Sequence, residues 1–160
     1  MTGSPPGSRI VHTAYDLGVG LSLGEDKDSP AYFRSQWYGD GGRLVAVFEV
    51  PQAPEPYLVI EFELPEMVRL TDEFWPSTET SSARWGGDLK AFCRTVEGAD
   101  YPTSLEWVRK TRPKAHLYQF VTSDECLEVI SENPPKARLA SAEQLSSYLE
   151  TQIRIVNPPS

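Results

Sequence analysis

The sequence predicts an α+β fold, a single domain in which a mainly antiparallel β-sheet from the N-terminal half carries about four short helices from the C-terminal half. Two periodicities predict this class. Between residues 9 and 64 the apolar residues alternate in short runs, as in strands, whereas after residue 80 they recur with the 3.6-residue period of a helix. A chain of 160 residues is long enough for one hydrophobic core. We therefore expect one domain over 9–156, with a flexible N-terminus over 1–8 and a flexible tail over 157–160.

A β-hairpin is expected over residues 31–50. The runs AYFRSQWY (31–38) and RLVAVFEV (43–50) are rich in β-branched and aromatic residues, and they flank GDGG, whose residues tolerate the positive φ angles of a tight turn. Residues 44–48 are apolar on both faces of the second strand. This strand is therefore expected in the centre of the sheet, covered on both sides.

Further segments have strand patterns. The run YLVIEFEL (57–64) alternates strictly, which places Glu61 and Glu63 on the face opposite its leucine, isoleucine and phenylalanine side chains. The remaining candidates are AHLYQFV (115–121) as a strand, ARLA (137–140) as a short connection or strand, and QIRIV (152–156) as a final edge strand.

The predicted helices begin where the period changes. In DLKAFCRTVEG (88–98) the apolar residues from Leu89 to Val96 lie at i, i+3, i+4 and i+7, and Gly98 is suited to end the helix. Three more helix starts are indicated by capping boxes, in which a Ser or Thr and a Glu or Gln three residues later satisfy the first N–H groups. These boxes occur at 103–106, 122–125 and 141–144.

Composition and charge limit the function classes. The formal charge of −8 disfavours a nucleic-acid partner and favours either a cationic partner, such as a basic protein, or plain solubility, which is the commoner reason for such a charge. No apolar run reaches the roughly 18 residues of a membrane helix, and the N-terminus lacks the pattern of a secretory signal. We therefore expect a cytoplasmic protein with no membrane partner. Cys93 and Cys126 are expected to be buried thiols on helices, as in a reducing compartment.

Two motifs suggest catalysis or metal binding, but their surroundings do not support them. The segment GLSLG (20–24) has the spacing of a hydrolase nucleophile elbow, yet Pro30 and a hairpin follow where the elbow requires a helix. We therefore expect Ser22 to be structural. A zinc site would need four ligands that are not spaced as local pairs, so neither a metal nor a cofactor is expected. Those four residues are His12, Cys93, His116 and Cys126.

The main candidate binding surface combines carboxylates with aromatic residues. Glu61 and Glu63 are two apart on one predicted strand, so their carboxylates should lie about 6–7 Å apart on one face. The loop that follows, FWPSTETSSARWGG, carries two tryptophans. The alternative is that the carboxylates are only solvated and that the indoles fill the core. The expected partner-binding or ligand-binding residues are Glu61, Glu63, Trp75, Trp85, Trp37 and Tyr38.

A second candidate patch opposes the overall charge. In EWVRKTRPKAH four cations stand against one acid, which suits a phosphate-bearing ligand or an acidic partner. The alternative is the solvated end of a helix, where cations offset the helix dipole and Pro113 stops the helix. The four cations are Arg109, Lys110, Arg112 and Lys114.

Two function classes remain open. The first is a small acidic interaction module of the inhibitor, immunity or antitoxin type, which covers a basic site on a partner with the acidic and aromatic surface. The second is a small-molecule-binding domain or an enzyme, such as a hydrolase, with a pocket near Glu61, Glu63 and Trp75. We favour the first, because binding needs only a complementary surface whereas catalysis needs a complete set of groups.

The enzyme alternative includes a resemblance. The Glu61-Phe-Glu63 pair and the serine-rich STETSS segment resemble ADP-ribosyltransferase-like domains, which use an arginine, a serine-rich strand and a Glu-x-Glu pair. Here the Glu-x-Glu precedes the serines, the reverse of that family's order, so the family's residue roles are not carried over. The resemblance implies only that Arg34 or Arg43 would hold a pyrophosphate.

Overall fold

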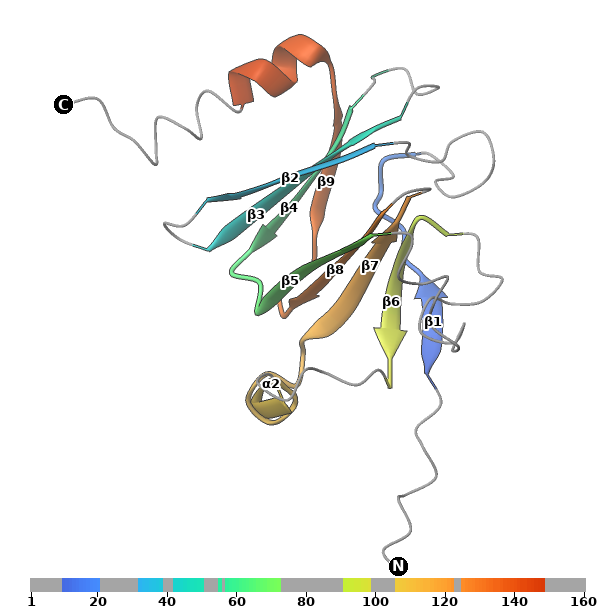
Figure 1. Ribbon diagram of the computed structural model, residues 1–160, viewed down its shortest axis with the longest axis vertical. Coiled ribbons are helices and arrows are strands. Elements are labelled where there is room, and N and C mark those ends of the chain that lie inside the picture. Colours follow the sequence, from blue (N-terminus) through green and yellow to red (C-terminus); the bar gives the residue numbers. More distant parts are fainter. Residues whose placement is uncertain are drawn as a thin grey trace, which may run out of the picture.

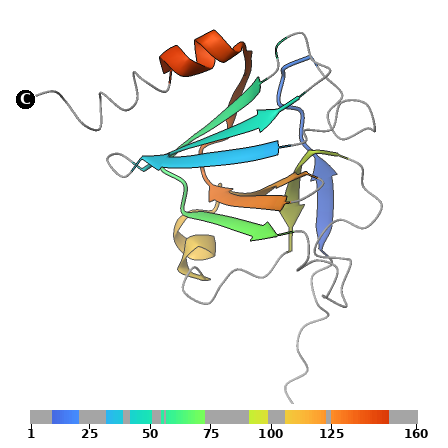
Figure 2. The same ribbon diagram turned by 45° about the horizontal axis from the view of Figure 1, so that its top comes forward.

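The protein is a single β-rich domain of two antiparallel sheets packed face to face, as the computed structural model shows (Figure 1). The structure describes residues 10–20, 32–38, 42–50, 55, 57–72, 91–98, 106–122 and 125–148, with the backbone alone at 32–38, 71–72 and 125. The sheets form two layers, and a helix lies on the outer side of each layer (Figure 2).

The strands are divided between the sheets in a non-sequential order. The five-stranded sheet has the order β1-β6-β7-β8-β5, and the four-stranded sheet has the order β2-β3-β4-β9. The first sheet consists of β1 (Val11–Ala14), β6 (Cys93–Glu97), β7 (His116–Val121), β8 (Glu125–Ser131) and β5 (Met67–Asp72). The second consists of β2 (Tyr32–Tyr38), β3 (Arg43–Glu49), β4 (Tyr57–Glu63) and β9 (Lys136–Ala140). The helices in the described part of the chain are α2 (Glu106–Thr111) and the 142–148 helix.

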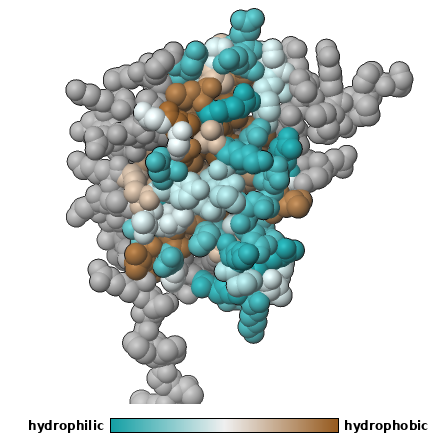
Figure 3. All heavy atoms as spheres, turned by 180° about the vertical axis from the view of Figure 1, so that it is seen from behind, coloured by the Kyte–Doolittle hydropathy of each residue, from teal (hydrophilic) through white to brown (hydrophobic). Residues whose placement is uncertain are grey.

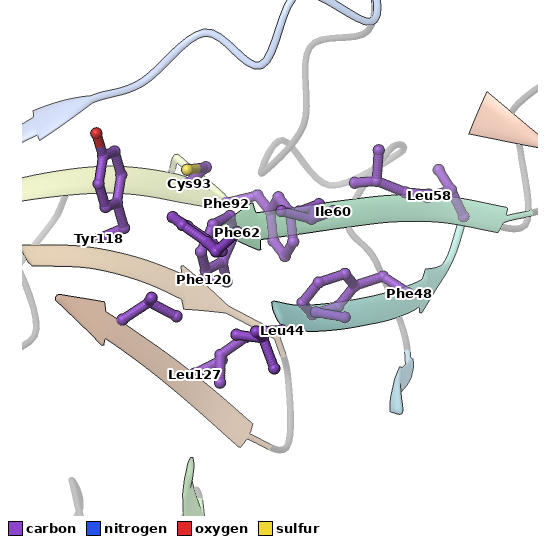
Figure 4. Packing of buried hydrophobic residues seen from close by; sticks show 13 residues of the cluster. Leu44, Phe48, Leu58, Ile60, Phe62, Phe92, Cys93, Tyr118, Phe120 and Leu127 are labelled. Atoms are coloured by element: carbon purple, nitrogen blue, oxygen red, sulfur yellow. The ribbon is translucent and has the colours of Figure 1, made fainter. Parts of the chain in front are cut away.

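The main core lies between the two sheets. The ring of Phe120 on β7 has its centroid 6.0 Å from that of Phe48 on β3 and 5.9 Å from that of Phe62 on β4. Phe92, just before β6, lies 4.9 Å from Phe48 and 5.7 Å from Phe120. Figure 4 shows these rings pointing toward one another between the strands. All four are at most 1% exposed, so they join the sheets through burial and through ring contacts.

The predicted hairpin is confirmed. Strands β2 and β3 pair in antiparallel register from Tyr38 opposite Arg43 to Tyr32 opposite Glu49. Gly42, at the end of the turn, has a φ of 63°, which glycine adopts without a steric penalty. The second strand, β3, lies between β2 and β4, in the interior position that its composition predicts.

Both faces of β3 are covered, as predicted. Its inner face joins the core between the sheets. On the outer face, Val45 and Val47, with Val59 of the neighbouring β4, pack against Leu145 and Tyr148 of the 142–148 helix. Apolar residues at successive positions of a strand thus indicate that a second layer lies on each side.

Helix α2 covers part of the outer face of the five-stranded sheet. Val108 is fully buried and packs with Val96 of β6, Leu117 of β7 and Ile130 of β8. This contact anchors a helix of six residues that would be too short to be stable in isolation.

The predicted fold class, with about four helices on one sheet, is wrong. Among the described residues only α2 and the 142–148 helix are helical, and only the second has seven residues. The described part of the C-terminal half contributes four strands, β6 to β9. The fold is therefore mostly antiparallel sheet in two layers.

The helix predicted over 88–98 is strand β6 in its described part. Cys93 belongs to the core between the sheets, whereas Val96 packs under α2 on the opposite face, and Arg94 is also buried. Because both faces are buried, the apolar residues do not alternate. Their spacing imitates a helix.

The capping box at 122–125 marks no helix, since residues 125–131 form strand β8. Leu127 and Val129 face the core between the sheets, while Ile130 packs under α2 on the other face. With Cys126, these residues lie at i, i+1, i+3 and i+4 around a buried glutamate, a spacing that fits a helix equally well.

The other predicted elements have mixed outcomes. Strand β7 confirms the strand at 115–121, and β9 shows that 137–140 belongs to a strand. Helix α2 begins at the last residue of the box at 103–106, whose earlier residues lie outside the described part. Strand β5 was not predicted. The segments 1–8, 152–156 and 157–160 also lie outside the described residues.

The capping box at 141–144 is confirmed atom by atom. The Gln144 N–H donates to the Ser141 hydroxyl over 3.1 Å, and the Ser141 N–H donates to Gln144 Oε1 over 2.9 Å. Two N–H groups at the start of the 142–148 helix are thereby satisfied.

Replacing Ser141 by alanine should lower the free energy of unfolding by about 1 kcal/mol, because the Gln144 N–H loses its acceptor. Urea denaturation followed by circular dichroism measures this change. The matched control is Ser146→Ala, an exposed serine within the same helix, which should change stability by less than about 0.5 kcal/mol. Equal losses in the two variants would contradict the cap.

Candidate functional site

Glu61 and Glu63 lie on the outer face of β4, as the alternation predicts. Glu61 is partly buried beside the 142–148 helix, where its carboxylate accepts a hydrogen bond from the Tyr148 hydroxyl. The Glu63 side chain is 54% exposed, and its Oε1 lies 3.3 Å from Nζ of Lys136 on β9. We call these four residues the β4 surface.

Cations adjoin both glutamates. Arg43 lies opposite Glu63 in the register of β3 and β4, and Lys136 lies on β9, the next strand. The guanidinium carbon of Arg138 stands 4.6 Å from the ring centroid of Tyr148. The described part of this face therefore mixes both charges and carries the rings of Tyr57 and Tyr148, rather than forming a uniformly acidic patch.

The aromatic partners expected for these carboxylates are not placed by the structure. Trp75 and Trp85 lie outside the described residues, and Trp37 and Tyr38 are described only by their backbone at the end of β2. The alternative pocket near Glu61, Glu63 and Trp75 therefore depends on a residue outside the described part. Within the described part, Tyr148 is the aromatic residue beside Glu61.

The basic patch divides into residues with different roles. Nε of Arg112 lies 3.5 Å from Glu66, and its Nη1 lies 3.2 Å from Glu132, which ties the end of α2 to the loops beside β5 and β8. Arg109 is near Glu106, one turn earlier, at 3.9 Å. Arg109 also lies in the last turn of α2, where a cation offsets the helix dipole.

Lys110 remains exposed on α2, three residues after Trp107, a tryptophan that was not among the predicted site residues, and Lys114 is exposed in the turn that follows the helix. Both lysines make no ion pair among the described residues, and the indole of Trp107 is 48% exposed. Hydrophilic residues gather at the lower right of Figure 3, where α2 lies. The useful signal in the sequence was a tryptophan within a basic segment, at a helix position next to the buried Val108.

A row of four polar residues, three of them buried, crosses the outer face of the five-stranded sheet. The register places Arg94 of β6 opposite Gln119 of β7, Gln119 opposite Glu128 of β8, and Glu128 opposite Arg69 of β5. Gln119 and Glu128 are each 1% exposed and Arg94 is 4% exposed. We call these four residues the polar row.

The charged groups of the polar row have partners in the protein. Arg69 donates through Nε and Nη2 to one oxygen of Glu128, over 3.0 and 2.6 Å, and Gln119 donates to the other oxygen over 3.2 Å. Arg94 donates to the carbonyl of Ala91, and burial lowers the pKa of its guanidinium. A shift of one residue in the pairing register of a strand would move its polar side chain to the opposite face, into the core between the sheets. The polar row therefore fixes strand register.

Glu128→Ala should lower the free energy of unfolding by about 2–4 kcal/mol, because Arg69 and the buried Gln119 amide lose their acceptor. Urea denaturation measures the change. Glu132→Ala is the matched control, since that glutamate is 32% exposed and pairs with Arg112, and its loss should stay below about 1 kcal/mol. A Glu128→Ala variant as stable as the control would show that the polar row does not stabilise the fold.

The four residues weighed as zinc ligands are not gathered at one place. Cys93 belongs to the core between the sheets, whereas Cys126 alternates with Leu127 onto the outer face of the same sheet. His116 is exposed at the start of β7, and His12 lies on the edge strand β1. Among the described residues no three His, Cys, Asp or Glu side chains are grouped to hold a metal ion. Ser22 lies outside the described residues.

Both cysteines are buried thiols, as predicted, but they lie on strands rather than helices. Burial raises the pKa of the Cys93 thiol, and the nearby charge of Arg94 opposes this only in part. Native Cys93 and Cys126 should therefore react with Ellman's reagent at least about a hundred times more slowly than after unfolding in guanidinium. Rapid reaction of both thiols in the folded protein would contradict this burial.

Comparisons with protein-family profiles, with curated proteins and with solved structures found no match to this chain. Neither helix in the described part is long and apolar enough to cross a membrane. The function must therefore be argued from the surfaces themselves.

Proposed function

We propose that the protein is a small interaction module of the inhibitor, immunity or antitoxin type, and that its β4 surface binds a basic partner. The observation that carries this proposal is the solvent exposure of Glu63 and of the lysine with which it pairs. Its carboxylate is 54% exposed and faces Lys136, which is itself 73% exposed. An exposed pair of this kind contributes about 0–1 kcal/mol. An arginine of a partner can therefore replace Lys136 at little cost and hold the carboxylate in two-pronged fashion.

Glu61 and Tyr148 form a rigid part of this surface, next to the Glu63–Lys136 pair that a partner can replace. The Tyr148 hydroxyl donates to Glu61, and Leu145 of the same helix packs on the sheet below. An aromatic ring held by packing and by a hydrogen bond suits an interface, because little conformational entropy remains to be lost on binding. Neighbouring Arg138 would favour partners whose acidic residues face it, which adds specificity.

The distribution of charge supports a basic partner at longer range. The described side chains include eleven acids and nine bases, whereas the remaining side chains carry twelve acids and six bases. The net charge of −8 therefore comes mainly from outside the described part. It would steer a basic partner toward the protein, and the local pattern of the β4 surface would set the docked pose. Two reduced thiols support the cytoplasm as the compartment.

Replacing Glu63 by lysine should slow association with the partner and weaken its dependence on salt, because the exchangeable carboxylate is lost. Partners captured by the wild-type chain from its native cells are compared by quantitative mass spectrometry, and rates for the leading basic candidate are then measured by surface plasmon resonance. Fold is checked by circular dichroism.

The matched control is Glu143→Lys, which changes the net charge equally at an exposed position of the 142–148 helix. It should leave dissociation unchanged and slow association less than Glu63→Lys does. Identical association and dissociation rates for the two variants would show that the partner binds at another surface of the protein. A captured partner that is itself acidic would overturn the assignment of charge.

A further inference from the structure

We propose that Trp107 and Lys110 on the exposed side of α2, together with Lys114 in the turn that follows the helix, form a second interaction surface, and that this surface binds an acidic segment of a partner protein. We call it the α2 surface. It lies on the outer side of the other sheet from the β4 surface (Figure 1). The inference goes beyond the proposed function, since it assigns a different surface and a partner of opposite charge.

The orientation of α2 is set by its buried side. Val108 is fully buried among residues of three strands. Arg112, one turn later, reaches Glu66 and Glu132. With two contacts holding the same side, the helix presents a defined opposite side to solvent, and that side needs no reordering on binding.

Trp107 stands on this presented side. Positions one residue apart differ by about 100° around a helix, so Trp107 points away from the direction of Val108. Lys110 is three residues further on and is therefore its neighbour on the surface. The indole is 48% exposed and makes no ring contact among the described residues. A large aromatic side chain that a rigid helix exposes to solvent is the type of residue that anchors protein interfaces.

The charge of this surface is positive because its two lysines are not neutralised. Arg109 and Arg112 have acidic partners at 3.9 and 3.2 Å, respectively. Lys110 and Lys114 are exposed without an ion pair in the described part of the chain. The helix dipole accounts for cations in the last turn but not for an exposed indole beside them. Together the groups fit a short segment with a few carboxylates and an apolar side chain.

The small size of the α2 surface favours a protein segment over other acidic partners. Membrane attachment needs a larger apolar face, and nucleic-acid binding needs many cations that replace counterions. The net charge of −8 would also repel an extended polyanion. A protein segment engages only the patch itself, at distances comparable to the screening length of physiological salt.

The test uses the whole chain and a set of short synthetic peptides in which Asp and Glu flank a central leucine or phenylalanine. Binding is measured by fluorescence anisotropy, and the indole N–H signal of Trp107, assigned with Trp107→Phe, is followed by NMR. We expect saturable binding that shifts this signal. Trp107→Ala and the double variant Lys110→Glu/Lys114→Glu should each weaken binding by about tenfold or more.

Two controls make the outcome specific to this surface. Lys136→Glu reverses the charge of an exposed side chain on β9 and should leave the affinity for the peptide within about twofold of the wild-type value. Glu63→Lys should also leave it unchanged, so failure of the β4 proposal and failure of this one are separable. All variants are checked for fold by circular dichroism.

Three results would overturn the proposal. The first is the absence of peptide binding, and the second is binding that none of the α2 variants weakens. The third is stronger binding to phosphatidylserine vesicles or to duplex DNA that requires the same three residues, which would replace a protein partner by a membrane or a nucleic acid.

Discussion

The packing of aromatic rings between the two sheets is the interaction on which the rest of the structure depends. Phe48 and Phe62 from one sheet meet Phe92 and Phe120 from the other, with ring centroids 4.9 to 6.0 Å apart. This cluster takes one face of each sheet into the core. The two outer faces must then be closed by other means, and the way in which each is closed determines which groups reach solvent.

Each outer face is divided between an apolar part under a short helix and a polar part beside it. The 142–148 helix covers valines of β3 and β4, and the charged β4 surface lies at its margin. On the other sheet α2 covers Val96, Leu117 and Ile130, and the polar row crosses the strands next to them. The helices serve as covers and also carry Tyr148 and Trp107, so the elements that close the fold also display its candidate recognition residues.

The sequence predicted well those strands whose apolar residues alternate or form a nearly continuous run, and it failed for strands covered on both faces in which a buried charged residue interrupts the apolar pattern. The hairpin, β4 and β7 followed from alternation or apolar runs, and the cap at Ser141 followed from local hydrogen bonding. Strands β6 and β8 imitate helices because Arg94 and Glu128 interrupt their apolar faces, yet both are buried in the polar row. The burial of Glu128 is made tolerable by Arg69 and Gln119 on the neighbouring strands, and that of Arg94 by the carbonyl of Ala91 just before its own strand. Partners on other strands cannot be seen in the local sequence pattern. The positions of Glu61 and Glu63 were predictable, whereas their contacts with Tyr148 and Lys136 depend on long-range pairing.

A double-mutant cycle between Phe48 and Phe120 tests most directly the central claim that the two sheets are joined by these rings. The single variants Phe48→Leu and Phe120→Leu and their combination are compared in urea denaturation. Because the rings lie 6.0 Å apart across the two sheets, the account predicts a coupling free energy of about 0.5–1.5 kcal/mol. Losses that add within about 0.3 kcal/mol would show that the rings do not interact and would contradict the face-to-face packing of the sheets.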